Sequence, residues 1–193
     1  MRNRTIKSFT AIFLAIALFS CGKDDDKTPT YQKENPLAAY LTATGFSEVS
    51  SNVDDGDYEF GLSFIPKVDG QISEIVVKLP GAQTNLRVTI WDAATKGILR
   101  TETIAAVVAE VQISKTITAL ALTKNKEYMI TFQTNDWYEH DHPEGTAQTY
   151  PITAGNISIT GYGYNEGTTQ TYPTSFQTDY YAGDLSFVFQ RTK

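Results

Sequence analysis

The stretch YEFGLSF, residues 58–64, decides the fold class, because its large apolar side chains recur at every second position. In an extended strand, successive side chains point to opposite faces of a sheet. Tyr58, Phe60, Leu62 and Phe64 would therefore share one face. The stretch predicts one strand of a half-buried β-sheet.

The same alternation recurs along most of the chain. It is found in NLRVTIW (85–91), KEYMITFQT (126–134), GNISITGYGY (155–164) and DLSFVFQ (184–190). Further strands are expected in QISEIVVKL (71–79) and EVQISKTIT (110–118), with turns at KVDGQ (67–71) and DAATKG (92–97). TIAAVVAEV (103–111) is interpreted as strand and turn, although its propensity also allows a short helix. Roughly eight strands without a βαβ rhythm predict an all-β fold, an antiparallel, jelly-roll-like β-sandwich.

Residues 1–20 are expected to be a secretory signal. Arg2, Arg4 and Lys7 give a positive start, and the apolar run at 9–19 is shorter than the roughly 20 residues that span a bilayer. The run ends in LFSC, residues 18–21, which resembles the lipobox of bacterial lipoproteins. This resemblance implies that Cys21, the only cysteine of the chain, carries a lipid. The alternative is an incidental cysteine after an ordinary signal.

The segment after Cys21 is expected to be a tether, covering residues 21–36. Its start, GKDDDK (22–27), resembles the acidic tract that sends surface lipoproteins of the Bacteroidota to the outer face of the outer membrane. The alternative is a solvated tether with no address. KTPTYQKENP (27–36) is polar and carries two prolines, which favours a flexible stalk. The folded domain is expected at 37–193, held by lipid at the outer membrane and displayed on the cell surface.

The charge of the chain argues against nucleic acid as a partner. Without residues 1–20, 173 residues remain, with 13 basic and 22 acidic side chains and a formal charge of −9. Nucleic-acid phosphates need a basic patch. The remaining length suits one domain with a substantial core.

Four segments in a shared order resemble a bacterial extracellular family of unknown function. They are YEFGLSFIPKVDGQISEIVVKL (58–79), NLRVTIWDAATKGILRTETI (85–104), LTKNKEYMITFQTND (122–136) and YPTSFQTDYYAGDLSFVF (172–189). Domains of that family look like jelly-roll sandwiches attached to surface and carbohydrate-active proteins. The resemblance covers about residues 58–190 and implies an accessory or binding role. It supplies no catalytic residues, and the charged EHDHPEG loop (139–145) departs from the family pattern.

Two aromatic segments are the candidate ligand-binding loops. NDWYEHDHP (135–143) holds Trp137, Tyr138, His140 and His142, and the second segment begins with Tyr162 and Tyr164. Sugar rings stack their C–H faces on flat aromatic rings, and Tyr and Trp combine an apolar body with a polar group. These six side chains are therefore the predicted ligand-binding residues. The alternative is that the aromatic rings close the ends of the sandwich core.

Metal binding is a second interpretation of the same loop. His140 and His142 are one residue apart, so in an extended segment both imidazoles could bind one zinc ion. Nothing else in the sequence identifies the remaining ligands, and a solvated polar loop is the more frequent explanation. Asp54, Asp55 and Asp57 offer a weaker calcium site, without the distant glutamate of a complete loop. No metal and no cofactor is predicted.

The function expected from the sequence is non-catalytic. The chain has no Gly-x-Ser-x-Gly elbow, phosphate loop or dinucleotide fingerprint. A carboxylate pair for glycoside hydrolysis cannot be identified among 22 acidic residues. We expect a surface-anchored lipoprotein whose sandwich binds an extracellular ligand, and the expected ligand is a glycan. The rival hypothesis is a structural or adhesive module of the cell envelope that contacts protein partners and has no small-molecule site.

Overall fold

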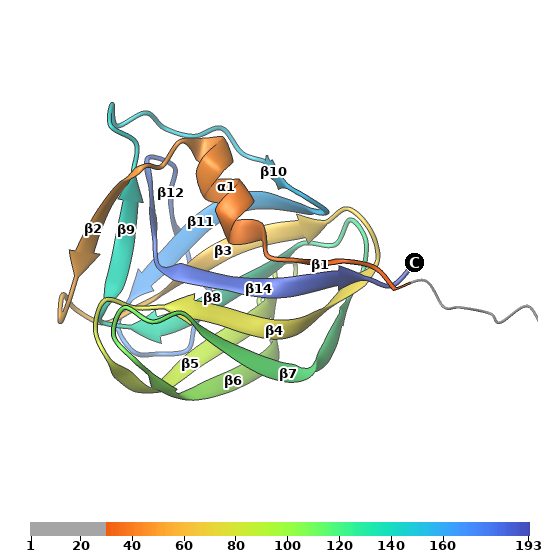
Figure 1. Ribbon diagram of the computed structural model, residues 1–193, viewed down its shortest axis with the longest axis horizontal. Coiled ribbons are helices and arrows are strands. Elements are labelled where there is room, and N and C mark those ends of the chain that lie inside the picture. The colour runs from red at the N-terminus through yellow and green to blue at the C-terminus, as the bar shows by residue number, and fades with distance from the viewer. Residues whose placement is uncertain (1–29) are drawn as a thin grey trace, which may run out of the picture. The chain divides into compact units, whose positions relative to one another are not determined.

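A computed structural model describes residues 30–193 (Figure 1). Tyr31–Lys193 form one compact unit of fourteen strands and one helix, and every strand pair is antiparallel. The predicted all-β antiparallel sandwich is confirmed, with more strands than the roughly eight expected. The signal at 1–20, Cys21 and the acidic tract at 22–27 lie outside the described residues.

One layer of the sandwich is a four-stranded sheet. Its order is β1 (Lys33–Glu34), β14 (Asp184–Arg191), β4 (Gly70–Lys78) and β7 (Ile113–Leu122). The β1 strand pairs with the C-terminal strand, and Lys33 forms a 2.6 Å ion pair with Glu74. The compact unit therefore begins at Tyr31, six residues before the expected boundary at residue 37, because the last residues of the expected stalk complete a sheet.

The other layer is a seven-stranded sheet. Its order is β10 (Ile152–Ala154), β11 (Ile157–Glu166), β3 (Tyr58–Pro66), β8 (Tyr128–Thr134), β5 (Gln83–Asp92) and β6 (Gly97–Val107), and β12 (Ser175–Gln177) also pairs with β11. The segment at 103–111 enters as the end of β6 followed by a turn, as expected. The predicted turn at 92–97 also forms, and Asp92 Oδ1 there accepts hydrogen bonds from two backbone amides.

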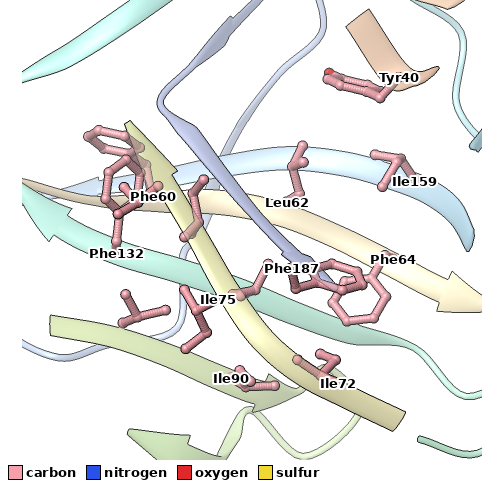
Figure 2. Close-up of a cluster of buried hydrophobic side chains, with 14 of the residues drawn as sticks. Tyr40, Phe60, Leu62, Phe64, Ile72, Ile75, Ile90, Phe132, Ile159 and Phe187 are labelled. Atoms are coloured by element: carbon pink, nitrogen blue, oxygen red, sulfur yellow. The ribbon is translucent and has the colours of Figure 1, made fainter. Parts of the chain in front are cut away.

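The core lies between these two sheets. Phe64 of β3 and Phe187 of β14 meet with ring centroids 4.5 Å apart, and Figure 2 shows the pair among the buried aliphatic side chains. Phe60, Leu62 and Phe64 are each at most 2 % exposed, so the alternation in residues 58–64 does place these side chains in the core.

Part of the far face of the seven-stranded sheet is also covered. Residues between β11 and β12 cross it, and Arg87 donates to the Thr168 carbonyl at 2.9 Å and to Glu59 at 2.6 Å. Glu59 is fully buried, and a buried carboxylate is tolerated only when it is paired. Because of this cover, β3 has buried side chains on both of its faces.

A short helix and a third sheet complete the unit. Helix α1 (Pro36–Thr44) begins after Asn35, whose side chain accepts from the Leu37 amide, and ends at Gly45 with φ of 70°. Asn and Pro at the start and a left-handed Gly at the end are standard helix boundaries. The third sheet has the order β13 (Tyr180–Ala182), β9 (Trp137–Asp141) and β2 (Glu48–Asn52). This small sheet forms one wall of the candidate site.

Candidate functional site

Residues 137–141 form a strand, not the polar loop that the sequence suggested. β9 pairs with β2 on one side and with β13 on the other. Alternate residues of a strand point to opposite faces. Trp137 and Glu139 therefore share one face, and Tyr138 and His140 lie on the other.

A cavity of about 240 Å³ opens where this small sheet meets the seven-stranded sheet. In Figure 1, β9 lies across the ends of β3 and β11, and these strands supply the cavity wall together with β13. The wall is mostly aromatic and carries two carboxylates. It consists of Tyr58, Phe60, Trp137, Glu139, Tyr162, Tyr164, Glu166, Tyr180 and Ala182.

Trp137 is buried against two rings of β3. Its indole centroid lies 5.3 Å from that of Tyr58 and 5.7 Å from that of Phe60, with edge-to-face angles of 80° and 75°. Only 8 % of Trp137 is exposed. The indole Nε1 is buried and has no hydrogen-bond partner among residues 30–193. A buried indole N–H normally has a partner, so this donor is an unusual feature of the cavity wall.

A β-bulge brings two tyrosines into the cavity. Ile157 and Ile159 of β11 face the core, and strict alternation would then turn Tyr162 and Tyr164 to the opposite face. The pairing of β11 with β3 shifts between Ile159 and Gly161, which reverses the alternation and aligns Tyr162 with Leu62. Tyr162 and Tyr164 therefore line the cavity, with centroids 6.4 Å apart and nearly parallel rings.

The two aromatic segments are thus adjacent in space. Tyr58 links them, because its ring lies 5.3 Å from Trp137 and 6.3 Å from Tyr164. Tyr180 of β13 packs against Tyr162 at 5.6 Å from the opposite side. Three of the six predicted ligand-binding residues, Trp137, Tyr162 and Tyr164, come together in one cavity.

Glu139 gives the cavity a carboxylate with a perturbed acidity. Burial raises its pKa above the ordinary value, and the nearby negative charge of Asp141 raises it further. The neighbouring Trp137 side chain lowers the pKa in part, without forming a hydrogen bond of ordinary geometry. Glu139 is therefore a partly desolvated acceptor with no cationic partner among the residues that raise or lower its pKa.

Tyr138 points away from the cavity. It is half-buried on the other face of β9, where the Lys78 ammonium lies 4.8 Å from its ring centroid. This cation–π contact occupies the ring that was expected to stack on a ligand. The prediction gave Tyr138 and Trp137 to the same binding site. Adjacent residues of a strand point to opposite faces, so the two side chains cannot both line the cavity.

The two histidines also lie outside the cavity. His140 is 7 % exposed, stacks on Tyr181 at 5.8 Å and places Nε2 2.5 Å from Asp184 Oδ1. The Nδ1 of His142 accepts a hydrogen bond from the Glu144 amide at 3.2 Å. Each imidazole thus contacts its own neighbours. Residues 30–193 contain no group of three or more His, Cys, Asp or Glu side chains arranged to hold a metal ion.

The aspartates at 54–57 make hydrogen bonds within the protein. The Asp54 carboxylate accepts from the Asn135 amide group at 2.9 Å, and Asp57 accepts from Gln133 at 3.0 Å. Asp57 also lines a shallower recess with Gly56, Tyr58, Glu166 and Gly167, next to the aromatic cavity. Tyr58 and Glu166 belong to both hollows, so the rim of the site is acidic.

The sequence alone did not identify Tyr58, Phe60, Glu139, Glu166, Tyr180 and Ala182 as part of this site. A strand assignment for residues 137–141 would have grouped Glu139 with Trp137 by alternation. The contribution of β13 depends on sheet pairing across about forty residues of chain, which no local pattern encodes.

No protein-family model matches this chain, and neither does any curated protein sequence. Within residues 30–193, no helix is both long and apolar enough to cross a membrane. The case for a function therefore rests on the geometry and chemistry of the cavity.

Proposed function

We propose that the protein is a lipid-anchored protein of the cell surface whose β-sandwich binds a glycan in the cavity between β3, β9, β11 and β13. The binding is non-catalytic. The lipobox-like LFSC at residues 18–21 and the acidic tract after it support the anchor and the surface location.

The observation that carries the proposal is a cavity of about 240 Å³ whose wall combines six aromatic side chains with two carboxylates. The indole N–H of Trp137 belongs to a residue of this wall and forms no hydrogen bond of ordinary geometry within residues 30–193. Aromatic rings and hydrogen-bonding groups gathered in one concave site are the usual features of a small-ligand pocket.

The size and lining of the cavity favour a sugar as the ligand. Its volume of about 240 Å³ is below the roughly 300–1,000 Å³ of drug-sized pockets, which suits one sugar ring. Tyr164 and Tyr180 are half-buried, so part of each side chain is accessible to a ligand. Glu139 and Glu166 can accept hydroxyl protons. A concave site of this kind also favours a small ligand over the flat protein contact of the rival hypothesis.

The direct test is a glycan array with the wild-type protein, Trp137→Ala and Tyr138→Ala. The two variants remove neighbouring aromatic side chains of one strand, but only Trp137 lines the cavity. We expect Trp137→Ala to lose about tenfold in affinity for each bound glycan, since the variant removes part of the cavity wall and an aromatic contact is worth up to about 1.5 kcal/mol. Tyr138→Ala should bind as the wild type does. If both variants bind as tightly as the wild type, the glycan binds elsewhere. A circular dichroism spectrum of each variant shows whether it is folded.

Glycoside hydrolysis is a second candidate, because the cavity holds two carboxylates and the pKa of Glu139 is raised. A protonated and an ionised carboxyl group on either side of a sugar are the requirements of this reaction. Incubation of the wild-type protein with its array ligands distinguishes the two functions. The binding function predicts that no reducing sugar is released, and release that Glu139→Gln abolishes would establish the enzyme.

Lipid attachment has its own test. Cells that express the protein in the presence of a labelled fatty acid should label the wild type and leave Cys21→Ser unlabelled. Protease added to intact cells should digest the wild-type protein if it is displayed on the surface. An unlabelled wild type would remove the anchor from the proposal.

A further inference from the structure

The wall of the cavity combines aromatic rings with acidic side chains and contains no basic side chain. Six of the nine lining residues are Phe, Tyr or Trp, and two are glutamates. Among the described residues that line the cavity, none is Lys, Arg or His. The lining residues therefore include two acidic groups and no basic group to balance them.

The aromatic rings of the cavity wall meet at steep angles. Tyr58 stands at 80° to Trp137 and at 65° to Tyr164. Tyr180 stands at 61° to Tyr162. Tyr58, Tyr164 and Tyr180 are each half-buried, so part of each side chain remains accessible at the cavity. Aromatic faces carry negative quadrupole potential, which attracts cations within about 6 Å of the ring centre.

The surroundings add negative charge to that of the rings. The pKa of Tyr180 is raised to about 12 by burial first and then by neighbours that include Glu139 and Asp179. The pKa of Tyr58 is raised by burial, by Glu166 and by Asp55. All of these charged neighbours are acids. Acidic side chains near the cavity favour a positive charge there, and this attraction is stronger where water is partly excluded.

Lys78, the basic residue next to β9, lies on the face of β9 that points away from the cavity. Lys78 lies over the Tyr138 ring, 4.8 Å from the centroid, and does not line the cavity. Lys78 therefore does not supply a positive charge to the wall of the cavity.

We propose that the cavity selects ligands that carry an organic cation, either a protonated amine or a quaternary ammonium group. The ring faces of Tyr58, Tyr164 and Tyr180 and the carboxylates of Glu139 and Glu166 surround the positive charge. This inference rests on the proposed function, because it specifies the ligand of the same cavity, and amino sugars satisfy both.

The experiment compares two molecules of one shape and different charge, choline and 3,3-dimethylbutan-1-ol. The second replaces the ammonium nitrogen of choline with carbon. Isothermal titration of the full chain should show choline binding at least about tenfold more tightly, as expected for a desolvated cation–π site. Glu139→Gln should weaken choline binding by about tenfold and leave the neutral alcohol unchanged. Glu144→Gln, which changes an exposed acid outside the cavity, is the matched control and should bind as the wild type does.

A second comparison, of glucosamine with glucose, separates the inference from the proposed function. Preference for glucosamine supports charge selection in a sugar site. Equal binding of the charged and neutral members of both pairs overturns charge selection but leaves the proposed glycan site intact. If glucose binds and neither choline nor glucosamine does, charge selection is likewise overturned and the glycan site remains. If none of the four molecules binds, the inference is overturned, and the glycan array then decides the proposed function alone.

Discussion

The two tryptophans of the chain make opposite predictions for the same substitution. Trp91 is 2 % exposed and its Nε1 donates to Thr131 Oγ1 at 2.8 Å. Trp137 is 8 % exposed and its Nε1 has no partner among the described residues. Tryptophan to phenylalanine removes the N–H group from each site and shrinks each ring by a similar amount. The difference between the two variants therefore isolates the hydrogen-bonding state of the indole.

The magnitudes follow from the two environments. Loss of three ring atoms from a buried side chain costs about 2 kcal/mol at either position. Trp91→Phe also loses a satisfied hydrogen bond, worth about 1 kcal/mol, so its total cost is about 3 kcal/mol. Trp137→Phe instead removes an unsatisfied donor, which returns about 1–3 kcal/mol. We therefore expect Trp137→Phe to lie within about 1 kcal/mol of the wild type.

Urea unfolding, followed by circular dichroism, gives the free energy of unfolding of all three proteins. The expected gap between the variants is about 2–4 kcal/mol, well above the error of the extrapolation. Equal destabilisation by the two substitutions would refute the reasoning, because it would mean that the Trp137 N–H is already satisfied in the free protein.

Three further predictions concern stability. Glu139→Gln should stabilise the unliganded protein at neutral pH, because the pKa of Glu139 is raised in the folded state and its charge therefore costs stability above that pKa. Thermal unfolding should show that the variant loses this extra stability below pH 4.5, the ordinary pKa, where the carboxyl group is protonated in both states. Phe64→Ala should cost about 3–5 kcal/mol in urea unfolding because the ring is fully buried, whereas Val49→Ala, at a position 58 % exposed, should change stability by about 0.5 kcal/mol or less. Asn35→Ala should cost about 1–2 kcal/mol, because the Asn35 side chain caps α1 and also accepts from Ser186; an unchanged midpoint would remove that role.

The fold class was predictable because residues 58–64 and the other alternating runs encode their own geometry. Period-two spacing marks a half-buried strand without any knowledge of its partners. Helix α1 was missed, although Asn35, Pro36 and Gly45 are ordinary boundary signals. The strand-favouring composition of the chain outweighed the boundary signals of this nine-residue helix when the sequence was interpreted.

The site was only half predictable, and the reason is the bulge in β11. Strict alternation from Ile157 and Ile159 places Tyr162 and Tyr164 on the outer face, and one extra residue returns these two rings to the inside. Bulges depend on the pairing with a neighbouring strand and leave little trace in the local sequence. Aromatic composition pointed to two segments that both contribute side chains to the cavity, and only tertiary structure could separate Trp137 from its neighbour Tyr138.

Nuclear magnetic resonance of the indole N–H groups tests the central claim most directly. The chain has two tryptophans and hence two indole signals, which Trp91→Phe assigns. The protein is titrated in turn with glucose, glucosamine and choline. The account predicts that a bound ligand shifts the Trp137 signal, because this ring lies in the cavity wall, while the Trp91 signal stays in place. A ligand that binds and leaves the Trp137 signal unmoved would contradict it.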